Sequence, residues 1–235
     1  MPPKIRYTAD APNLVACSGA ATTRPTRGLP RHVLSELIYL ADLAHYSTSG
    51  YAVSIGGTRE HQFAELAKLA RASAPSQFHH SHFDIAEAPD GTPAAAVAGF
   101  DRTAANDYAT AALTEIGWTT PQIEALFERI APLEEAYPEE APGTWTIEHV
   151  ATLPAYRGQG LIRQLIAKVL ERGADQGFTL AIVDVFDGNA RARAIYEDAG
   201  FRRTTVFGHA ALRQVFDRDP LIRLVRPLRR SLPIT

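Results

Sequence analysis

The chain of 235 residues has a single cysteine, Cys17, and no apolar run near the ~20 residues that a membrane-spanning helix requires. One thiol cannot form an internal disulfide or supply the several thiolates of a metal cage. The formal net charge of −2 lacks the basic excess that attracts proteins to nucleic acid or anionic lipid. These shortages predict a cytoplasmic protein that requires no metal and has neither nucleic acid nor membrane as a partner.

The length fits one large domain of ordinary globular composition. Residues 1–30 hold five prolines and one acidic residue, so we expect an N-terminal extension that is mostly loop, with a short strand at residues 4–8. The domain itself is expected to span residues 31–235, with a helical insertion at residues 103–142.

Two different periodicities organise the first half of this domain. Apolar residues at helical spacing predict helices over residues 33–44 and 61–71. Two apolar runs, residues 83–88 and 94–100, flank a Pro-Asp-Gly-Thr turn sequence and predict an antiparallel hairpin.

The insertion carries its own helix signal. Thr120 before Pro121 predicts an N-cap followed by a first helical residue. The apolar stripe of this helix consists of Ile123, Leu126, Phe127 and Ile130. Its other face and its tail are acidic, which indicates either a solvated face or a lip that attracts a cationic substrate.

The last third of the chain is the most regular part. Strands are predicted at residues 145–153, 178–186 and 202–207, with helices at residues 160–176 and 190–199 between them. This alternation predicts an α/β fold in which helices cover a sheet.

A glycine-rich turn with an arginine follows the strand at residues 145–153, and it consists of Arg157, Gly158, Gln159, Gly160 and Leu161. At the start of a helix the backbone N–H groups have no helical acceptor, and glycine lets a phosphate approach them closely. The turn lacks the Gly-Lys-Ser/Thr of a nucleotide phosphate loop and the third glycine of a dinucleotide loop. It therefore predicts a diphosphate site of another kind, or else a plain tight turn.

A second segment has ligand-binding character. Asn189, Ala192 and Tyr196 are spaced so that they share one helical face, with Asn189 as a natural N-cap. Gly200 then closes the helix. Tyr196 either presents its hydroxyl to a ligand or is an ordinary half-buried aromatic that covers the sheet.

Together the two segments resemble the GNAT N-acetyltransferase superfamily. Its acetyl-CoA signature falls on Arg157, Gly160 and Ile162, with Ile162 departing from the small residue of the pattern. Its second signature falls on Asn189, Ala192, Tyr196, Gly200 and Phe201. The resemblance implies a mixed, mostly antiparallel central sheet, flanked by helices, in which the strands at residues 145–153 and 178–186 splay apart.

The resemblance also implies acetyl-CoA as cosubstrate and a role for each matched residue. The backbone of Val150 and Thr152 would pair with the pantetheine arm, and the diphosphate would lie on the turn. The implied cofactor-binding residues are Val150, Thr152, Arg157, Gly158, Gln159, Gly160, Leu161, Asn189 and Ala192. Tyr196 would protonate the departing thiolate, since a phenol with a pKa of about 10 holds its proton at pH 7 yet can give it to sulfur.

The nucleophile must be a neutral amine, and deprotonating a lysine-like amine at pH 7 costs roughly 4.6 kcal/mol. Strand alternation places Glu148 on the same face as Val150 and Thr152, and His149 on the other face. We therefore expect Glu148 rather than His149 to be the general base, directly or through water. The alternative is that Glu148 only orients a cationic substrate.

The histidines at residues 79–82 are expected to belong to a polar loop rather than to a metal site. His79, His80 and His82 with Asp84 could suggest a metal cluster, but a short histidine run before a strand is typically a polar loop. The expected function is direct transfer of an acetyl group to a primary amine of a small molecule. A protein or peptide N-acetyltransferase and a non-catalytic acyl-CoA-binding module are the alternatives, and a homodimer is compatible with all three.

Overall fold

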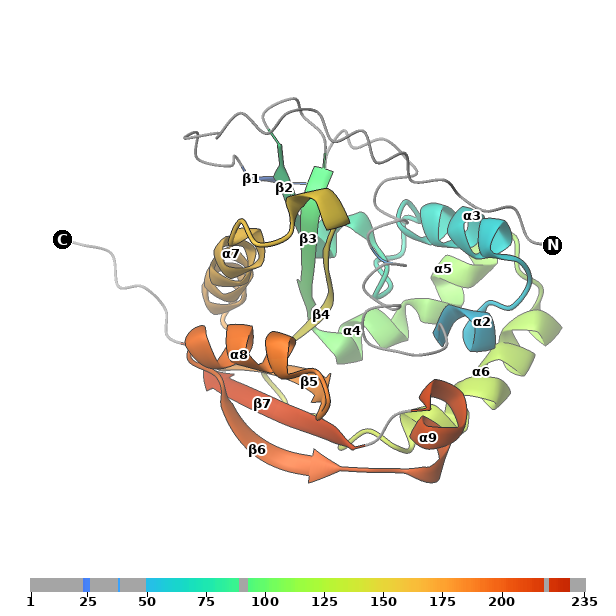
Figure 1. Ribbon diagram of the computed structural model, residues 1–235. Coiled ribbons are helices and arrows are strands. Elements are labelled where there is room, and N and C mark those ends of the chain that lie inside the picture. Colours follow the sequence, from blue (N-terminus) through green and yellow to red (C-terminus); the bar gives the residue numbers. More distant parts are fainter. Residues whose placement is uncertain (1–22, 26–37, 39–49, 89–92, 218–219, 229–235) are drawn as a thin grey trace.

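The computed structural model describes residues 23–25, 38, 50–88, 93–217 and 220–228. Seven strands form one sheet in the order β1-β2-β3-β4-β5-β7-β6 (Figure 1). The strands are β1 (Thr23–Pro25), β2 (Phe83–Glu87), β3 (Pro93–Phe100), β4 (Thr144–Thr152), β5 (Leu180–Phe186), β6 (Arg202–Phe207) and β7 (Leu221–Pro227). Among these strands only β4 and β5 pair in parallel, so the sheet is mixed and mostly antiparallel, as predicted.

Helices cover both faces of the sheet (Figure 1). The helices are α2 (Gly50–Ser54), α3 (Arg59–Leu69), α4 (Arg102–Asp107), α5 (Ala109–Glu115), α6 (Thr120–Glu134), α7 (Leu161–Asp175), α8 (Ala190–Asp198) and α9 (Ala210–Phe216), with 3-10 turns η1 (His80–His82) and η2 (Pro154–Tyr156). Helices α7 and α8 pack on one face and α2 and α3 on the other. Strand β3 is buried along its whole length because it lies between these two layers.

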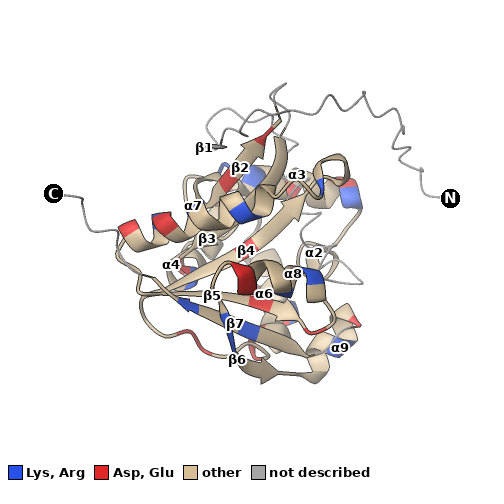
Figure 2. Cartoon of the chain, turned by 60° about the vertical axis from the view of Figure 1, so that its left-hand side comes forward, with Lys and Arg blue, Asp and Glu red and all other residues tan. Residues whose placement is uncertain are grey.

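Neighbouring residues of β3 belong to different cores. Ala95 and Val97 pack with α7 and α8, whereas Ala96 and Ala98 pack with the residues of α2 and α3. The small side chains of this strand let both helical layers approach closely. Acidic and basic residues are interspersed on the helices rather than sorted by sign (Figure 2).

The predicted hairpin and helical insertion are present. Strands β2 and β3 pair antiparallel, and residues 103–142 contribute most of α4 together with α5 and α6. The N-cap of α6 is Thr119 rather than Thr120, because the backbone N–H and the hydroxyl of Thr119 both donate to Gln122 Oε1. Ile123 and Leu126 of the predicted stripe are buried, whereas Phe127 is exposed.

Two differences concern the ends of the chain. Thr23–Pro25, inside the region expected to be a loop extension, is a strand that pairs with β2 at the sheet edge. The sequence interpretation missed α9 and β7, and β7 lies between β5 and β6. The strand predicted at residues 4–8 and, apart from the helical and buried Ile38, the helix predicted at residues 33–44 fall outside the described residues.

Candidate active site

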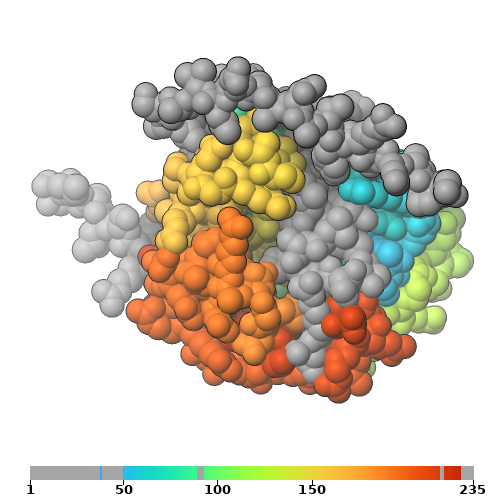
Figure 3. Space-filling model, viewed as in Figure 1, coloured from blue at the N-terminus to red at the C-terminus, as the bar shows by residue number. Residues whose placement is uncertain are grey.

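One cavity of about 620 Å³ lies where β4, the β4–α7 connection and α8 meet. All nine residues predicted to bind the cofactor line it, as does Tyr196. In Figure 3 the yellow surface around the β4–α7 connection lies directly above the orange surface of α8. Segments about thirty residues apart in the sequence therefore form one site, while Glu148 is not part of this lining.

Two glycines of the β4–α7 connection take left-handed backbone conformations. Gly158 and Gly160 have φ of +83° and +74°, and Gly160 is the N-cap of α7. A Cβ added at either glycine would meet no atom within 4 Å, so both face open space. The first N–H groups of α7 and the guanidinium of Arg157 border this space, an arrangement that fits a diphosphate.

Ile162 departs from the small residue of the family signature, and the structure shows where it lies. Its side chain packs partly against the core beneath α7 and also borders the cavity. The residue thus narrows the cavity on its core side without occupying the space beside Gly158 and Gly160.

The predicted splaying of β4 and β5 is confirmed. The two strands pair only from Thr144–Leu180 to Thr146–Ile182, although β4 continues to Thr152 and β5 to Phe186. Beyond residue 146 the edge of β4 that faces β5 forms no ladder with it. Val150 and Thr152 lie on this separated part of β4 and border the cavity.

Helix α8 closes the other side of the cavity. Asn189 caps it, with its side-chain oxygen accepting from the Ala192 N–H at 3.2 Å. Tyr196 is 2% exposed and its ring meets the edge of Phe201 at a centroid distance of 5.9 Å. Burial raises the pKa of Tyr196, so the phenol is neutral at pH 7.

The prediction that Glu148 shares a face with Val150 and Thr152 is wrong, because β4 has a bulge. Ala98 pairs with Glu148 and Ala96 with Ala151, so an advance of three residues along β4 matches an advance of two along β3. Within this bulge His149 takes φ of +50°. The extra residue reverses the alternation. Glu148 therefore shares a face with Ala151, whereas Val150 packs on the opposite face beside α7.

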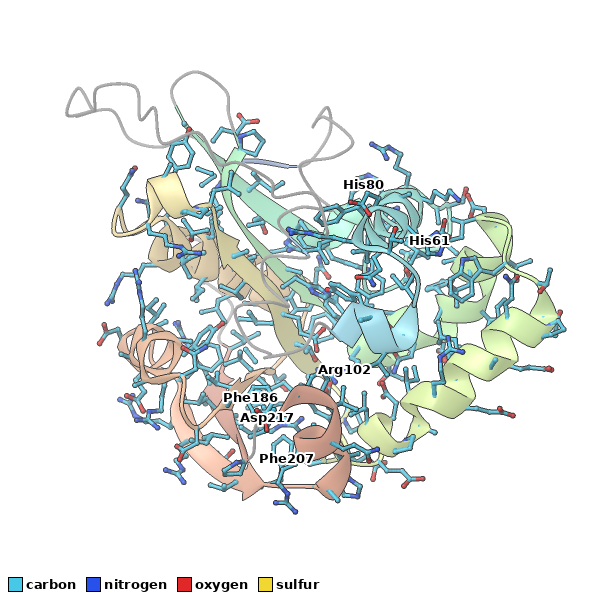
Figure 4. All side chains as sticks on the ribbon, turned by 45° about the vertical axis from the view of Figure 1, so that its right-hand side comes forward. His61, His80, Arg102, Phe186, Phe207 and Asp217 are labelled. Carbon is cyan, nitrogen blue, oxygen red and sulfur yellow. The ribbon has the colours of Figure 1, made fainter. Side chains whose placement is uncertain are left out.

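On its own face Glu148 belongs to a charged cluster that the sequence analysis missed. Its Oε1 is paired with a terminal nitrogen of Arg102, whose Nε lies 2.8 Å from Glu140 Oε1. Glu140 Oε2 in turn accepts from the Thr146 hydroxyl. Burial raises the pKa of Glu140, while Glu148 and Glu140 raise the pKa of Arg102 against the opposing effect of its own burial. In the view of Figure 4 Arg102 lies near the centre of the picture.

The histidine run lies at a 3-10 turn before β2. The rings of His80 and His82 contact the backbone carbonyls of Ala70 and Pro75, and Asp84 is paired with Arg172. Within the described part of the chain, no three histidine, cysteine or carboxylate side chains are grouped to hold a metal ion. No helix in the same part is long and apolar enough to cross a membrane.

Two solved structures illustrate the shared fold. The chain matches an N-acetyltransferase from Staphylococcus aureus Mu50 with a TM-score of 0.66 and 16% identity, over 88% of this chain and 100% of that one. It matches a phosphinothricin acetyltransferase from Sinorhizobium meliloti, solved with AcCoA, with a TM-score of 0.50 and 12% identity, over 89% of each chain.

The family follows from the sequence match. Residues 64–201 match the acetyltransferase (GNAT) family, and the chain belongs to it. A curated relative, human N-acetyltransferase 8B, is 26% identical over 106 residues, which are 44% of this chain. The matched part spans about half of that relative, 47% of its length.

Proposed function

We propose that the protein is an N-acetyltransferase that moves the acetyl group of acetyl-CoA directly to a primary amine of a small molecule. The observation that carries this proposal is the single cavity that joins the turn at Arg157–Gly160, the separated edge of β4 and the buried Tyr196. Membership of the acetyltransferase family supports the class of reaction.

Backbone N–H and C=O groups and the charge of Arg157 hold the cofactor. The N–H groups at the start of α7, together with Arg157, bind the diphosphate, and each amide bond to a charged acceptor contributes about 1.5–3 kcal/mol. The N–H and C=O groups of β4 near Val150 and Thr152, free of β5, pair with the pantetheine arm. Bound in this way, acetyl-CoA supplies an acyl carbon in the gap between β4 and β5.

Tyr196 acts as the acid. The amine nitrogen forms a bond to the acyl carbon, the C–S bond breaks, and the phenol gives its proton to the sulfur that leaves. The nitrogen then gives its second proton to the tyrosinate, which restores Tyr196. Burial raises the pKa of Tyr196, so the phenol carries its proton at pH 7 and has it to give when a thiolate forms beside it.

Glu148 acts as the base from the other side of the sheet. Because β5 pairs with β4 only as far as Thr146, Glu148 borders the gap on the face opposite the cavity. An amine that arrives from this face meets the acyl group between the strands. Arg102 holds Oε1 of Glu148, so Oε2 is the oxygen that takes the proton of the ammonium group.

The insertion favours a small acceptor. Arg102 begins α4 and Glu140 follows α6, and both contact one another beside Glu148. The inserted residues therefore lie against the face from which the amine arrives, which narrows the approach of an extended peptide. Cys17, the residue that an acetyl-cysteine intermediate would require, lies outside the described residues, and the proposed transfer is direct.

A screen of small amines with acetyl-CoA and thiol detection tests the proposal. We expect CoA release with at least one small amine and acetylated product by mass spectrometry. Calorimetry with acetyl-CoA alone separates binding from turnover. Binding without turnover on any amine or peptide would support an acyl-CoA-binding module instead, and turnover on peptides alone would move the acceptor class to proteins.

A further inference from the structure

His149 has a backbone conformation that side chains rarely adopt. Its φ is +50°, and in the described part of the chain Asp217 is the other non-glycine residue with positive φ. Histidine tolerates this region better than most residues, yet the conformation costs energy and persists only where the surroundings impose it. Such positions cluster at functional sites.

The bulge directs the imidazole of His149 into an aromatic pocket. The ring stacks on Phe83 with a centroid distance of 5.7 Å and an interplanar angle of 24°. Phe78 lies against it at 5.3 Å. The side chain is 11% exposed, so its two nitrogens are placed by the fold rather than by solvent.

Each nitrogen faces one polar group. Nδ1 lies 3.3 Å from the Tyr51 hydroxyl, and Nε2 lies 3.8 Å from Glu148 Oε2. Nε2 is a buried atom without a hydrogen-bond partner among the described residues. The other charged or titratable groups that act on the ring are Arg102 and His82.

These neighbours determine which nitrogen carries the proton. Burial, with Arg102 as a second cause, lowers the pKa of His149 to about 3, so the ring is neutral at pH 7 and has one N–H. Glu148 Oε2 lies 3.8 Å from Nε2, too far for a hydrogen bond, but the negative carboxylate attracts an N–H at this distance, so the proton belongs on Nε2. Nδ1 is then an acceptor, and the Tyr51 hydroxyl donates to it.

We propose that His149 is a positioning residue for Glu148: its Nε2–H directs the Oε2 oxygen that Arg102 leaves for the proton of the amine. This inference rests on the proposed function, because it concerns Glu148 as the base. Arg102 from α4 then pairs with Oε1, His149 from the bulge faces Oε2, and the Tyr51 hydroxyl from α2 contacts Nδ1 of His149.

A spectroscopic experiment tests the tautomer without using activity. Long-range ¹H–¹⁵N spectra of the wild-type protein at pH 7 should show His149 neutral and protonated on Nε2. In Tyr51→Phe the donor to Nδ1 is lost, and we expect the Nδ1-protonated form to appear. A wild-type ring protonated on Nδ1 would overturn the inference, whatever the activity of the protein.

A double-mutant cycle tests the action through Glu148. Asparagine tolerates positive φ, so His149→Asn keeps the backbone and removes the ring. We expect kcat to fall about tenfold, a part of the 10²–10⁴-fold that a general base contributes, with acetyl-CoA affinity unchanged. In a Glu148→Gln background the same change should alter kcat less than about twofold.

The outcomes distinguish the positioning role of His149 from the proposed role of Glu148 as the base. Unchanged kcat in His149→Asn, or a full further loss in the Glu148→Gln background, would show that His149 does not act through Glu148. No loss of kcat in Glu148→Gln would reject Glu148 as the base. Should His149→Asn fail to fold, Tyr51→Phe enters the same cycle in its place.

Discussion

Gly99 of β3 lies directly against the indole of Trp145 of β4: a Cβ built on Gly99 would stand 2.6 Å from Trp145 Nε1 and would also overlap Val169 of α7. Glycine at this position lets α7 approach the sheet. Because α7 begins at the glycine turn, this contact also sets how the turn is placed over the separated end of β4.

The Gly99→Ala variant should therefore be less stable. Overpacking a close contact of this kind costs typically about 1–3 kcal/mol, because both the indole and the helix must move. Gly188→Ala is the control, since a Cβ there would meet nothing within 4 Å. We expect urea unfolding to show the loss in Gly99→Ala and a change within about 0.5 kcal/mol in Gly188→Ala. Equal stability of both variants would contradict the close contact.

Gly160→Ala should weaken acetyl-CoA binding at least tenfold in calorimetry. Its φ of +74° is strained for alanine, and the added methyl group enters the open space beside the first N–H groups of α7. Gly177→Ala provides the matched control, because Gly177 has φ of +91°, has open space around it and is not among the cavity-lining residues. Both variants should lose about 1 kcal/mol of stability, but only Gly160→Ala should lose affinity.

Tyr196→Phe should lower kcat by about 10²-fold while leaving the Kd for acetyl-CoA nearly unchanged. The ring remains packed against Phe201, and the only group removed is the hydroxyl that is proposed to protonate the thiolate. Tyr156→Phe is the control, because Tyr156 also lines the cavity but has no proposed part in the reaction. Equal turnover of Tyr196→Phe and wild type would remove Tyr196 from the acid role.

The protein should lose stability as the pH falls below 6.5. Burial lowers the pKa of His149 from 6.5 to about 3 and that of His79 to about 4. The unfolded chain therefore takes up protons first, and the loss begins at about 6.5 and ends near each folded pKa. The buried His149 costs about 1.4 kcal/mol per pH unit within its window. His79 is partly exposed, and solvent screening makes its contribution smaller.

His149→Asn separates this contribution from that of the carboxylates. Between pH 7.5 and 5.5 the free energy of unfolding of the variant should fall by about 1.4 kcal/mol less than that of wild type. The measurement is a pair of urea titrations at each pH. Parallel losses in the two proteins would mean that the imidazole is not buried in its neutral form.

Local signals in the sequence predicted many of the residues that line the cavity. The tight turn at Gly158 and Gly160, the cap at Asn189 and the shared face of Ala192 and Tyr196 all depend on residues within one or two helical turns. The same holds for the helices and strands between residues 144 and 207, whose bounds differ from prediction by a few residues at most.

The surroundings of Glu148 could not be predicted in the same way. A bulge arises from pairing, since only the register against β3 shows that an extra residue lies between Glu148 and Ala151. Simple alternation therefore assigned Glu148 to the wrong face. Arg102 is separated from Glu148 by 46 residues, and no spacing in the sequence indicates that they meet.

The sequence by itself thus determined the fold class, the glycine-rich turn and the helix that carries Tyr196, because each follows from hydrogen bonds and steric limits between near neighbours. Only the tertiary structure decided which face of β4 presents Glu148, what holds its carboxylate, and where β7 enters the sheet. Those features depend on strand register and on charges brought together from distant segments, and such contacts exist only once the chain has folded.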